Sequence, residues 1–181
     1  FAVINGLLRG DNNSLIKQAK DVLKITPNPR KVLPWVGIAV EIDDKNQPLK
    51  NASKFFTFLP LPIKSNYPVH IHGWFDLNPK RTEITSSGSG DDKETLVHWN
   101  ELLLEEGVSK AWALLIDYLK IEQTNHYDFW AKETEFPLND KLVKGFYKHI
   151  SELKCFYTVY KEKKEWISPK EIYLHYFKDE K

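Results

Sequence analysis

The chain has 181 residues, with 26 lysine and arginine residues against 25 acidic ones, and its formal net charge is +1. This balance gives no electrostatic support for nucleic-acid binding, which usually shows a basic excess. The single cysteine, Cys155, excludes an internal disulfide and a cysteine-rich zinc site, and fits a reducing, cytoplasmic compartment. No apolar run could span a bilayer and no secretory signal opens the chain, so we expect no membrane partner.

The first predicted elements are a strand over residues 3–8 and a helix behind it. Asn13 or Ser14 can cap this helix, and Pro27 ends it. We interpret the Arg-Gly-Asp sequence at 9–11 as a turn into the helix rather than as an adhesion motif. The apolar residues at helical spacing are Leu15, Ile16, Ala19, Val22 and Leu23.

Three strands of a meander are predicted next, over residues 35–42, 54–59 and 68–77. The polar loop at 43–48 predicts that the first two strands form a hairpin. A flexible Gly/Ser/Asp loop at 85–93 separates this sheet from the helical part of the chain.

Two helical stripes follow, with Thr95 as a cap for the first and an interruption at Gly107. An aromatic connector at 125–137 leads to a third helix behind Pro137. The expected inward residues of this third helix are Leu142, Val143, Phe146, Ile150 and Leu153. Those of the first helical stripe are Leu96, Trp99, Leu103 and Leu104, and those of the second are Val108, Ala111, Trp112, Leu115 and Leu119.

The last elements are a strand over 155–160, a charged turn at 161–165 and a short helix with Ser168 as cap and Pro169 at its first position. Cys155 beside Phe156 is expected to be a buried thiol. The order predicts an α+β fold, an antiparallel or mixed sheet with helices packed on it. We expect domains at 1–121 and 122–181, the second smaller and mostly helical.

His70 and His72 lie two residues apart on a predicted strand, so both rings face the same side. They resemble a metal-binding pair, but two imidazoles make a weak site. We interpret them as one polar face of the sheet, and a small metal-binding protein stays the least favoured alternative. Gly73 in the same strand indicates a close approach of another group.

Lys80 and Arg81 follow Pro79 at a turn, where arginine can bind a phosphate through its fork and lysine as a point charge. The alternative is an ordinary solvated turn. No Walker loop, dinucleotide fingerprint or Ser/His/Asp elbow is present in the sequence, so the chain alone has no complete catalytic site and no bound cofactor is expected.

The motifs at 35–39 (WVGIA), 56–62 (FTFLPLP), 68–77 (PVHIHGWFDL) and 99–103 (WNELL), together with Arg81, resemble the sacsin-type relatives of the ninety-kilodalton heat-shock chaperones. The resemblance covers residues 1–120 and gives Pro60, Pro62, Gly73, Phe75 and Trp99 as its structural positions. Asn78-Pro79-Lys80 departs from it, because the family has a double arginine there.

In such proteins this region follows an ATP-binding domain, so the resemblance implies a piece of a longer, cytoplasmic, chaperone-related polypeptide. The resemblance also implies that residues 1–121 form a transducer or middle domain, which is similar to the transducer domain of gyrase-type ATPases. When this chain is aligned with the transducer domain of gyrase-type ATPases, Arg81 takes the place of the lysine that reaches the terminal phosphate of ATP in those proteins, and Lys80 lies beside it. The implied partners are the ATP-binding domain, which holds ATP, and client proteins. The alternative is a nucleotide-independent interaction module, favoured if the aromatics at 127–130 are exposed.

Overall fold

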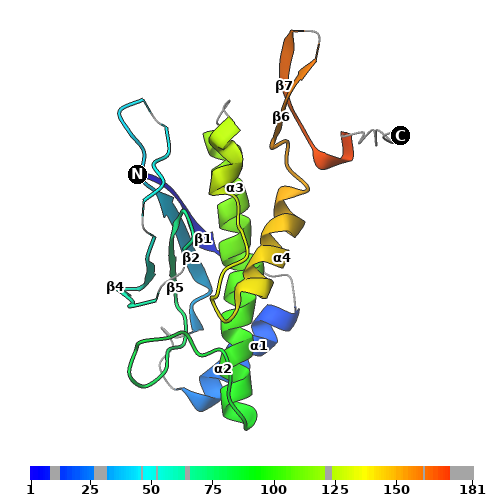
Figure 1. The fold of residues 1–181 in the computed structure, drawn as a ribbon. Coiled ribbons are helices and arrows are strands. Elements are labelled where there is room, and N and C mark those ends of the chain that lie inside the picture. The colour runs from blue at the N-terminus through cyan, green and yellow to red at the C-terminus, as the bar shows by residue number, and fades with distance from the viewer. Residues whose placement is uncertain are drawn as a thin grey trace, which may run out of the picture.

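The structure is a computed structural model that describes residues 1–8, 13–26, 32–45, 47–51, 53–63, 66–120, 124–160 and 162–171. The described residues form a five-stranded sheet and a two-stranded hairpin. Figure 1 shows the helices on one face of the large sheet and the hairpin projecting away from both. The predicted α+β class with a mixed sheet is therefore confirmed.

The large sheet has the strand order β1-β2-β5-β3-β4. Its β3 runs parallel to β5, and its other pairs are antiparallel. The strands are β1 (Ala2–Leu7), β2 (Trp35–Val40), β3 (Phe55–Thr57), β4 (Leu59–Pro60) and β5 (His70–Gly73).

The predicted hairpin between residues 35–42 and 54–59 is wrong. The loop after β2 closes on itself, with a single bridge between Ile42 and Pro48 and with Asp43 Oδ1 accepting backbone hydrogen bonds from Lys45 and Gln47. The chain then returns to the sheet on the far side of β5. Because β5 rather than β3 lies beside β2, the antiparallel meander is replaced by a mixed sheet.

A long helical rod covers the inner face of the sheet (Figure 1). It consists of α2 (Asp91–Leu102), a π-helical segment (Leu103–Val108) and α3 (Ser109–Leu119), without a break in the helix. The other helices are α1 (Asn13–Ile25), α4 (Asn139–Ile150) and two short 3-10 helices, Thr124–Phe129 and Pro169–Glu171.

Two predictions about this rod are wrong. The first helix begins at Asp91, behind Gly90, so Thr95 is not its cap. Carboxylates at its first turn interact favourably with the helix dipole in place of a side-chain cap. Gly107 does not interrupt the rod but lies buried in the π segment, where a Cβ would come within 2.8 Å of Leu8 and 3.0 Å of Val36. The sheet packs onto the helix at this glycine.

The core lies between the rod and the sheet. Every second residue of β2, namely Val36, Ile38 and Val40, is buried in this core, as the period of two in a strand requires. Ile71 of β5 is buried in the same core. The same hydrophobic cluster includes α4 and Cys155. The division into residues 1–121 and 122–181 stays a prediction. The largest fully buried side chains among the described residues are Trp99, Trp112, Phe55, Phe146, Ile38, Ile71, Leu103, Leu104, Leu115, Ile116, Leu142 and Ile150.

The C-terminal part differs from the expectation at residues 163–167. A second strand, β7 (Lys163–Ile167), pairs with β6 (Phe156–Tyr160) where a charged turn was predicted. Ser168 donates its N–H and its hydroxyl to the carboxylate of Glu171, both at 2.8 Å, and the N–H contact is one half of a capping box. The predicted turn at 9–11 and the rest of the last helix lie outside the described residues.

The helices of the described residues include none with the length and apolarity needed to cross a membrane. In α1, Val22 is buried while Leu23 is 41% exposed, so the apolar residues at helical spacing do not all face the core.

Candidate functional site

The candidate site is the cationic loop, residues 76–85, which carries Lys80 and Arg81. Its two legs are joined by a bridge between Leu77 and Ile84, and the N–H of Asn78 donates to Glu83 O at 3.0 Å. The loop is therefore a closed, hydrogen-bonded structure.

Asn78 organises the tip of the cationic loop. Its Oδ1 accepts the N–H of Thr82 and its Nδ2 donates to Thr82 Oγ1, both at 2.9 Å, while its carbonyl accepts the N–H of Arg81 at 2.8 Å. Arg81 has a φ of 56°, in the left-handed region that non-glycine residues adopt at a cost of roughly 1 kcal/mol. Such strain is found where a loop holds a side chain in one direction.

Lys80 and Arg81 are both exposed, and neither forms an ion pair with another residue that the structure describes. Glu83 on the return leg is also exposed. The two cations are thus free to meet an anion that approaches from outside.

The base of the cationic loop is held by the side chain of Asn100, which is fully buried in the last turn of α2. Its Oδ1 accepts the N–H of Asp76 at 2.8 Å. Its Nδ2 lies 2.9 Å from both Asp76 O and Thr85 O, so that the amide reaches both legs of the loop. A buried amide with these three contacts fixes the loop on the helical rod.

Trp99, Phe75 and Gly73 lie together just before the cationic loop. The indole Nε1 of Trp99 donates to Trp74 O at 3.1 Å, and the Trp99 side chain is 1% exposed. A Cβ on Gly73 would come within 2.8 Å of the Phe75 ring. Glycine is needed here because the buried Phe75 ring folds back over the strand. These motif residues therefore support the point where β5 passes into the loop.

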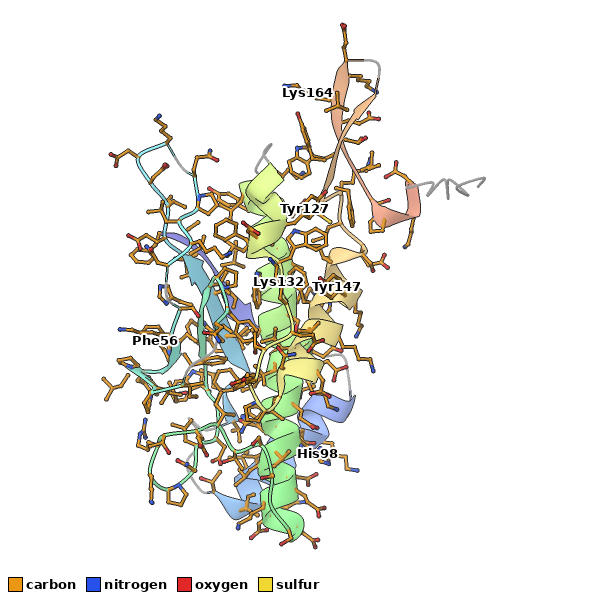
Figure 2. All side chains as sticks on the ribbon, in the orientation of Figure 1. Phe56, His98, Tyr127, Lys132, Tyr147 and Lys164 are labelled. Atoms are coloured by element: carbon orange, nitrogen blue, oxygen red, sulfur yellow. The ribbon has the colours of Figure 1, made fainter. Side chains whose placement is uncertain are left out.

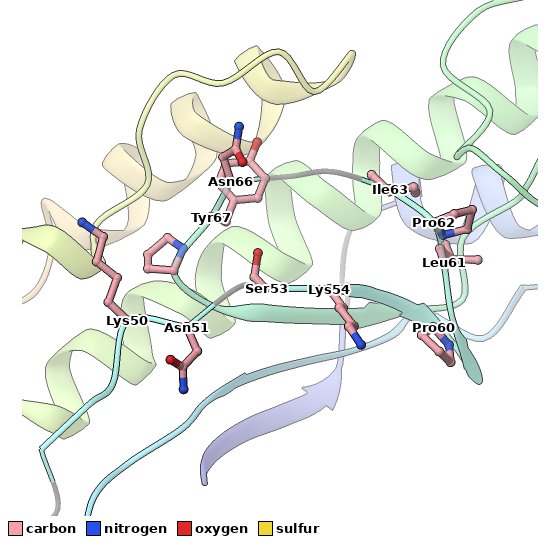
Figure 3. Close-up of a pocket in the computed structure, with 11 residues that line it drawn as sticks. Lys50, Asn51, Ser53, Lys54, Pro60, Leu61, Pro62, Ile63, Asn66 and Tyr67 are labelled. Atoms are coloured by element: carbon pink, nitrogen blue, oxygen red, sulfur yellow. The ribbon is translucent and has the colours of Figure 1, made fainter.

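Pro60 and Pro62 lie elsewhere, on the rim of a groove of about 770 Å³ shown in Figure 3. Leu61 between them is buried and its N–H donates to Phe55 O at 2.8 Å, while the two prolines are exposed. The FLPLP motif thus reverses the chain after β3. It does not contribute to the cationic loop.

His70 and His72 point from β5 to the face of the sheet away from the helices. His70 Nδ1 accepts the N–H of Lys54 at 3.1 Å, and His72 Nε2 accepts that of Phe58 at 3.0 Å. Burial lowers the pKa of both imidazoles, which favours the neutral form. A neutral imidazole has one acceptor nitrogen, and each is already used. Among the described residues no group of three or more potential ligands could hold a metal ion.

The face of the sheet opposite the helices is aromatic, which the sequence reading missed. Trp35 packs edge-on against His72 with ring centroids 4.7 Å apart, and Phe58 packs against Trp74 at 4.3 Å. Figure 2 shows Phe56 on this same side. Phe56 and Phe58 lie two residues apart in a predicted strand and so face the same side, and this spacing was the signal that could have revealed the aromatic face.

The aromatics at 127–130 do not form an exposed surface. Phe129 and Trp130 are 2% and 6% exposed, and the indole of Trp112 donates to Phe129 O at 2.8 Å. Only Tyr127 of this group is partly exposed, at 39%. The condition that would favour an interaction module is therefore not met here, because Phe129 and Trp130 pack against Trp112 of α3 and Phe146 of α4.

The described site is therefore a hydrogen-bonded loop that carries two exposed cations and is fixed on α2 through Asn100. No protein-family model and no solved structure matches the chain. A curated relative is human sacsin, which is 30% identical over 134 residues, covering 68% of this chain and 3% of sacsin. The similarity supports a sacsin-related region, and the chain spans only a small part of that relative.

Proposed function

We propose that this chain is a chaperone-related region that couples a neighbouring ATP-binding domain to domain rearrangement or client binding. In this proposal Arg81, assisted by Lys80, contacts the terminal phosphate of ATP held by that domain. The observation that carries the proposal is the cationic loop itself, hydrogen-bonded at its tip through Asn78 and fixed to α2 through Asn100. The similarity to sacsin supports the chaperone-related context.

The chemistry suits such a contact. A guanidinium binds two phosphate oxygens at once, and a cation supplied from a second domain stabilises charge that develops during phosphoryl transfer. When the phosphate leaves, the attraction is lost. Because Asn100 joins both legs of the loop to α2, a displacement of the loop would act directly on the helical rod.

The test is ATP turnover by the parent polypeptide that contains the ATP-binding domain. We expect Arg81→Ala to lower turnover by about tenfold, which corresponds to ~1.4 kcal/mol of transition-state stabilisation. Arg81→Lys keeps the positive charge and loses the two-pronged contact of the guanidinium, so its turnover should lie between those of the wild type and Arg81→Ala. Lys45→Ala, at an exposed lysine in a distant turn, is the control and should leave turnover unchanged. Equal turnover in all four proteins would contradict the phosphate contact.

A second candidate function is a protein-interaction module that never contacts nucleotide. The open aromatic face of the sheet favours it, because Phe58 is 63% exposed and described residues do not cover it. This function predicts that Phe58→Ala impairs association with a partner protein while Arg81→Ala leaves ATP turnover unchanged. A normal partner interaction in Phe58→Ala would count against it.

A further inference from the structure

The two edges of the large sheet differ in how they are protected. The β4 edge has two residues and ends in Pro60, and both shortness and proline discourage pairing with another strand. The β1 edge has six residues, without proline or charge, and β2 is its only strand neighbour among the described residues. An edge of this length without such devices is suited to accept a further strand.

The hydrogen-bond pattern shows which backbone groups of β1 face outward. Leu8 N–H donates to Pro34 O at 2.8 Å, which continues the antiparallel register of β1 with β2. Because hydrogen-bonded and non-bonded residues alternate in such a pair, the N–H and C=O groups of Val3, Asn5 and Leu7 point to the free edge. Three residues at this spacing form a template for one added strand.

A groove of about 370 Å³ runs beside this edge, between β1 and the helices. Ile4 and Leu8 line it from the strand, and Leu102, Ala111 and Leu114 from the rod. Leu114 is 41% exposed, so apolar surface at this position is still open. A strand added to β1 would place every second side chain in this groove.

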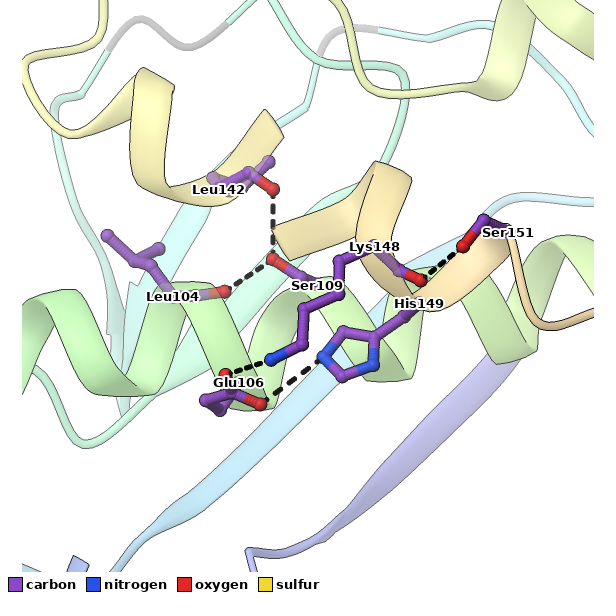
Figure 4. Close-up of polar contacts among 7 residues, drawn as sticks. All are labelled: Leu104, Glu106, Ser109, Leu142, Lys148, His149 and Ser151. Atoms are coloured by element: carbon purple, nitrogen blue, oxygen red, sulfur yellow. Dashed lines mark hydrogen bonds and ion pairs between the residues drawn. The ribbon is translucent and has the colours of Figure 1, made fainter. Parts of the chain in front are cut away.

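The charges of the groove favour an acidic occupant. Figure 4 shows Glu106 between Lys148, at 2.6 Å, and His149, at 3.5 Å. Burial lowers the pKa of His149, so it contributes little positive charge near neutral pH. With Glu106 balanced by Lys148, Lys110 on the groove wall remains without an ion-pair partner among the described residues.

We propose that the β1 edge binds an extended segment of a partner protein by strand addition. The segment has apolar side chains at alternate positions and a carboxylate that reaches Lys110. A second copy of this chain fits less well, because its own β1 has no acidic residue and a two-fold pairing would place two Lys110 side chains on one face. The proposal concerns a different surface from the cationic loop and does not depend on ATP.

The probe is a fluorescein-labelled peptide of about seven residues that alternates valine and threonine, with aspartate at one valine position. Its binding to the 181-residue chain is measured by fluorescence anisotropy. Asn5→Pro removes an outward N–H without touching the β1–β2 ladder, and should weaken binding by about tenfold. Asn5→Ala keeps that N–H and should bind as the wild type does.

Two further measurements do not depend on how well the proline variant folds. The same peptide methylated on every backbone nitrogen should lose binding to the wild-type chain, because neither of its edges keeps an N–H donor to pair with β1. Lys110→Glu should weaken the aspartate peptide by about threefold and strengthen a version with lysine at that position.

Equal binding of the methylated and unmethylated peptides, or no binding of any peptide, would overturn the proposal. Sedimentation of the chain without peptide tests the alternative occupant. A dimer that Asn5→Pro abolishes would show that the edge belongs to a second copy, and would also overturn the proposal.

Discussion

Replacing Asn100 with alanine tests whether its side chain holds the cationic loop on the rod. The substitution removes the acceptor for Asp76 N–H and the donor for the carbonyls of Asp76 and Thr85. Asp76 O keeps a second hydrogen bond, from Thr85 N–H at 3.0 Å. Two backbone groups, Asp76 N–H and Thr85 O, therefore lose the partner that Asn100 gave them.

An unsatisfied buried polar group costs about 1–3 kcal/mol, and both groups here are partly buried, so water can reach them in part. The low half of that range for each group gives an expected loss of about 2–4 kcal/mol in the free energy of unfolding. The cavity left by the amide adds to this loss, because Asn100 is fully buried.

The assay is urea unfolding followed by far-UV circular dichroism, with hydrogen exchange at the Asp76 amide as a local probe. Asn51→Ala is the matched control: Asn51 is exposed, its side chain donates to the Glu41 carboxylate, and the expected change is within about 0.5 kcal/mol. A loss in Asn100→Ala as small as that of the control, with the Asp76 amide still protected, would refute the role assigned to Asn100.

Gly145→Ala would place a Cβ 2.3 Å from Glu105 O where α4 crosses the π segment, so we expect a loss of about 3 kcal/mol in urea unfolding. Gly6→Ala meets no atom within 4 Å and should be nearly neutral. Burial raises the pKa of the Cys155 thiol to about 11, so a disulfide reagent at pH 8 should label it about a hundredfold more slowly in the folded chain than in urea. Burial also lowers the pKa of His149, so the folded state binds fewer protons than the unfolded state. The stability that follows from this difference is complete above about pH 6.5 and is lost as the pH falls through the folded pKa. His149→Gln should therefore flatten the stability profile in that range, and an unchanged profile would contradict it.

The helical elements could be predicted because their apolar spacing is a local property. Leu142, Phe146 and Ile150 are buried on α4 as their period requires. Strand pairing is not local, and the sequence around Phe55 fits a neighbour on either side equally well. The position of β3 beyond β5 depends on how the loop at 43–51 leaves the sheet, which only the folded chain shows.

The candidate site was predictable only at its tip. The sequence Pro79-Lys80-Arg81 predicts a charged turn, because proline favours turns and the two residues after it are cations. The partners of Asn100 lie 24 and 15 residues before it in sequence, and an asparagine inside a helical stripe gives no sign of them. The β1 edge was equally hidden, because an edge strand and a central strand of similar composition read alike until the order of the sheet is known.

The link between Asn100 and Arg81 can be separated from the effect of charge alone by combining the two alanine substitutions in the parent polypeptide. If the loop acts on the rod through Asn100, removing Asn100 already uncouples Arg81, and the double variant should turn over ATP no more slowly than the slower single variant. Such non-additivity amounts to an interaction energy of about 1 kcal/mol or more. If Arg81 only supplies a mobile positive charge, the two losses should add in free energy. Additive losses would show that the cationic loop and the rod work independently, even if Arg81 contacts phosphate.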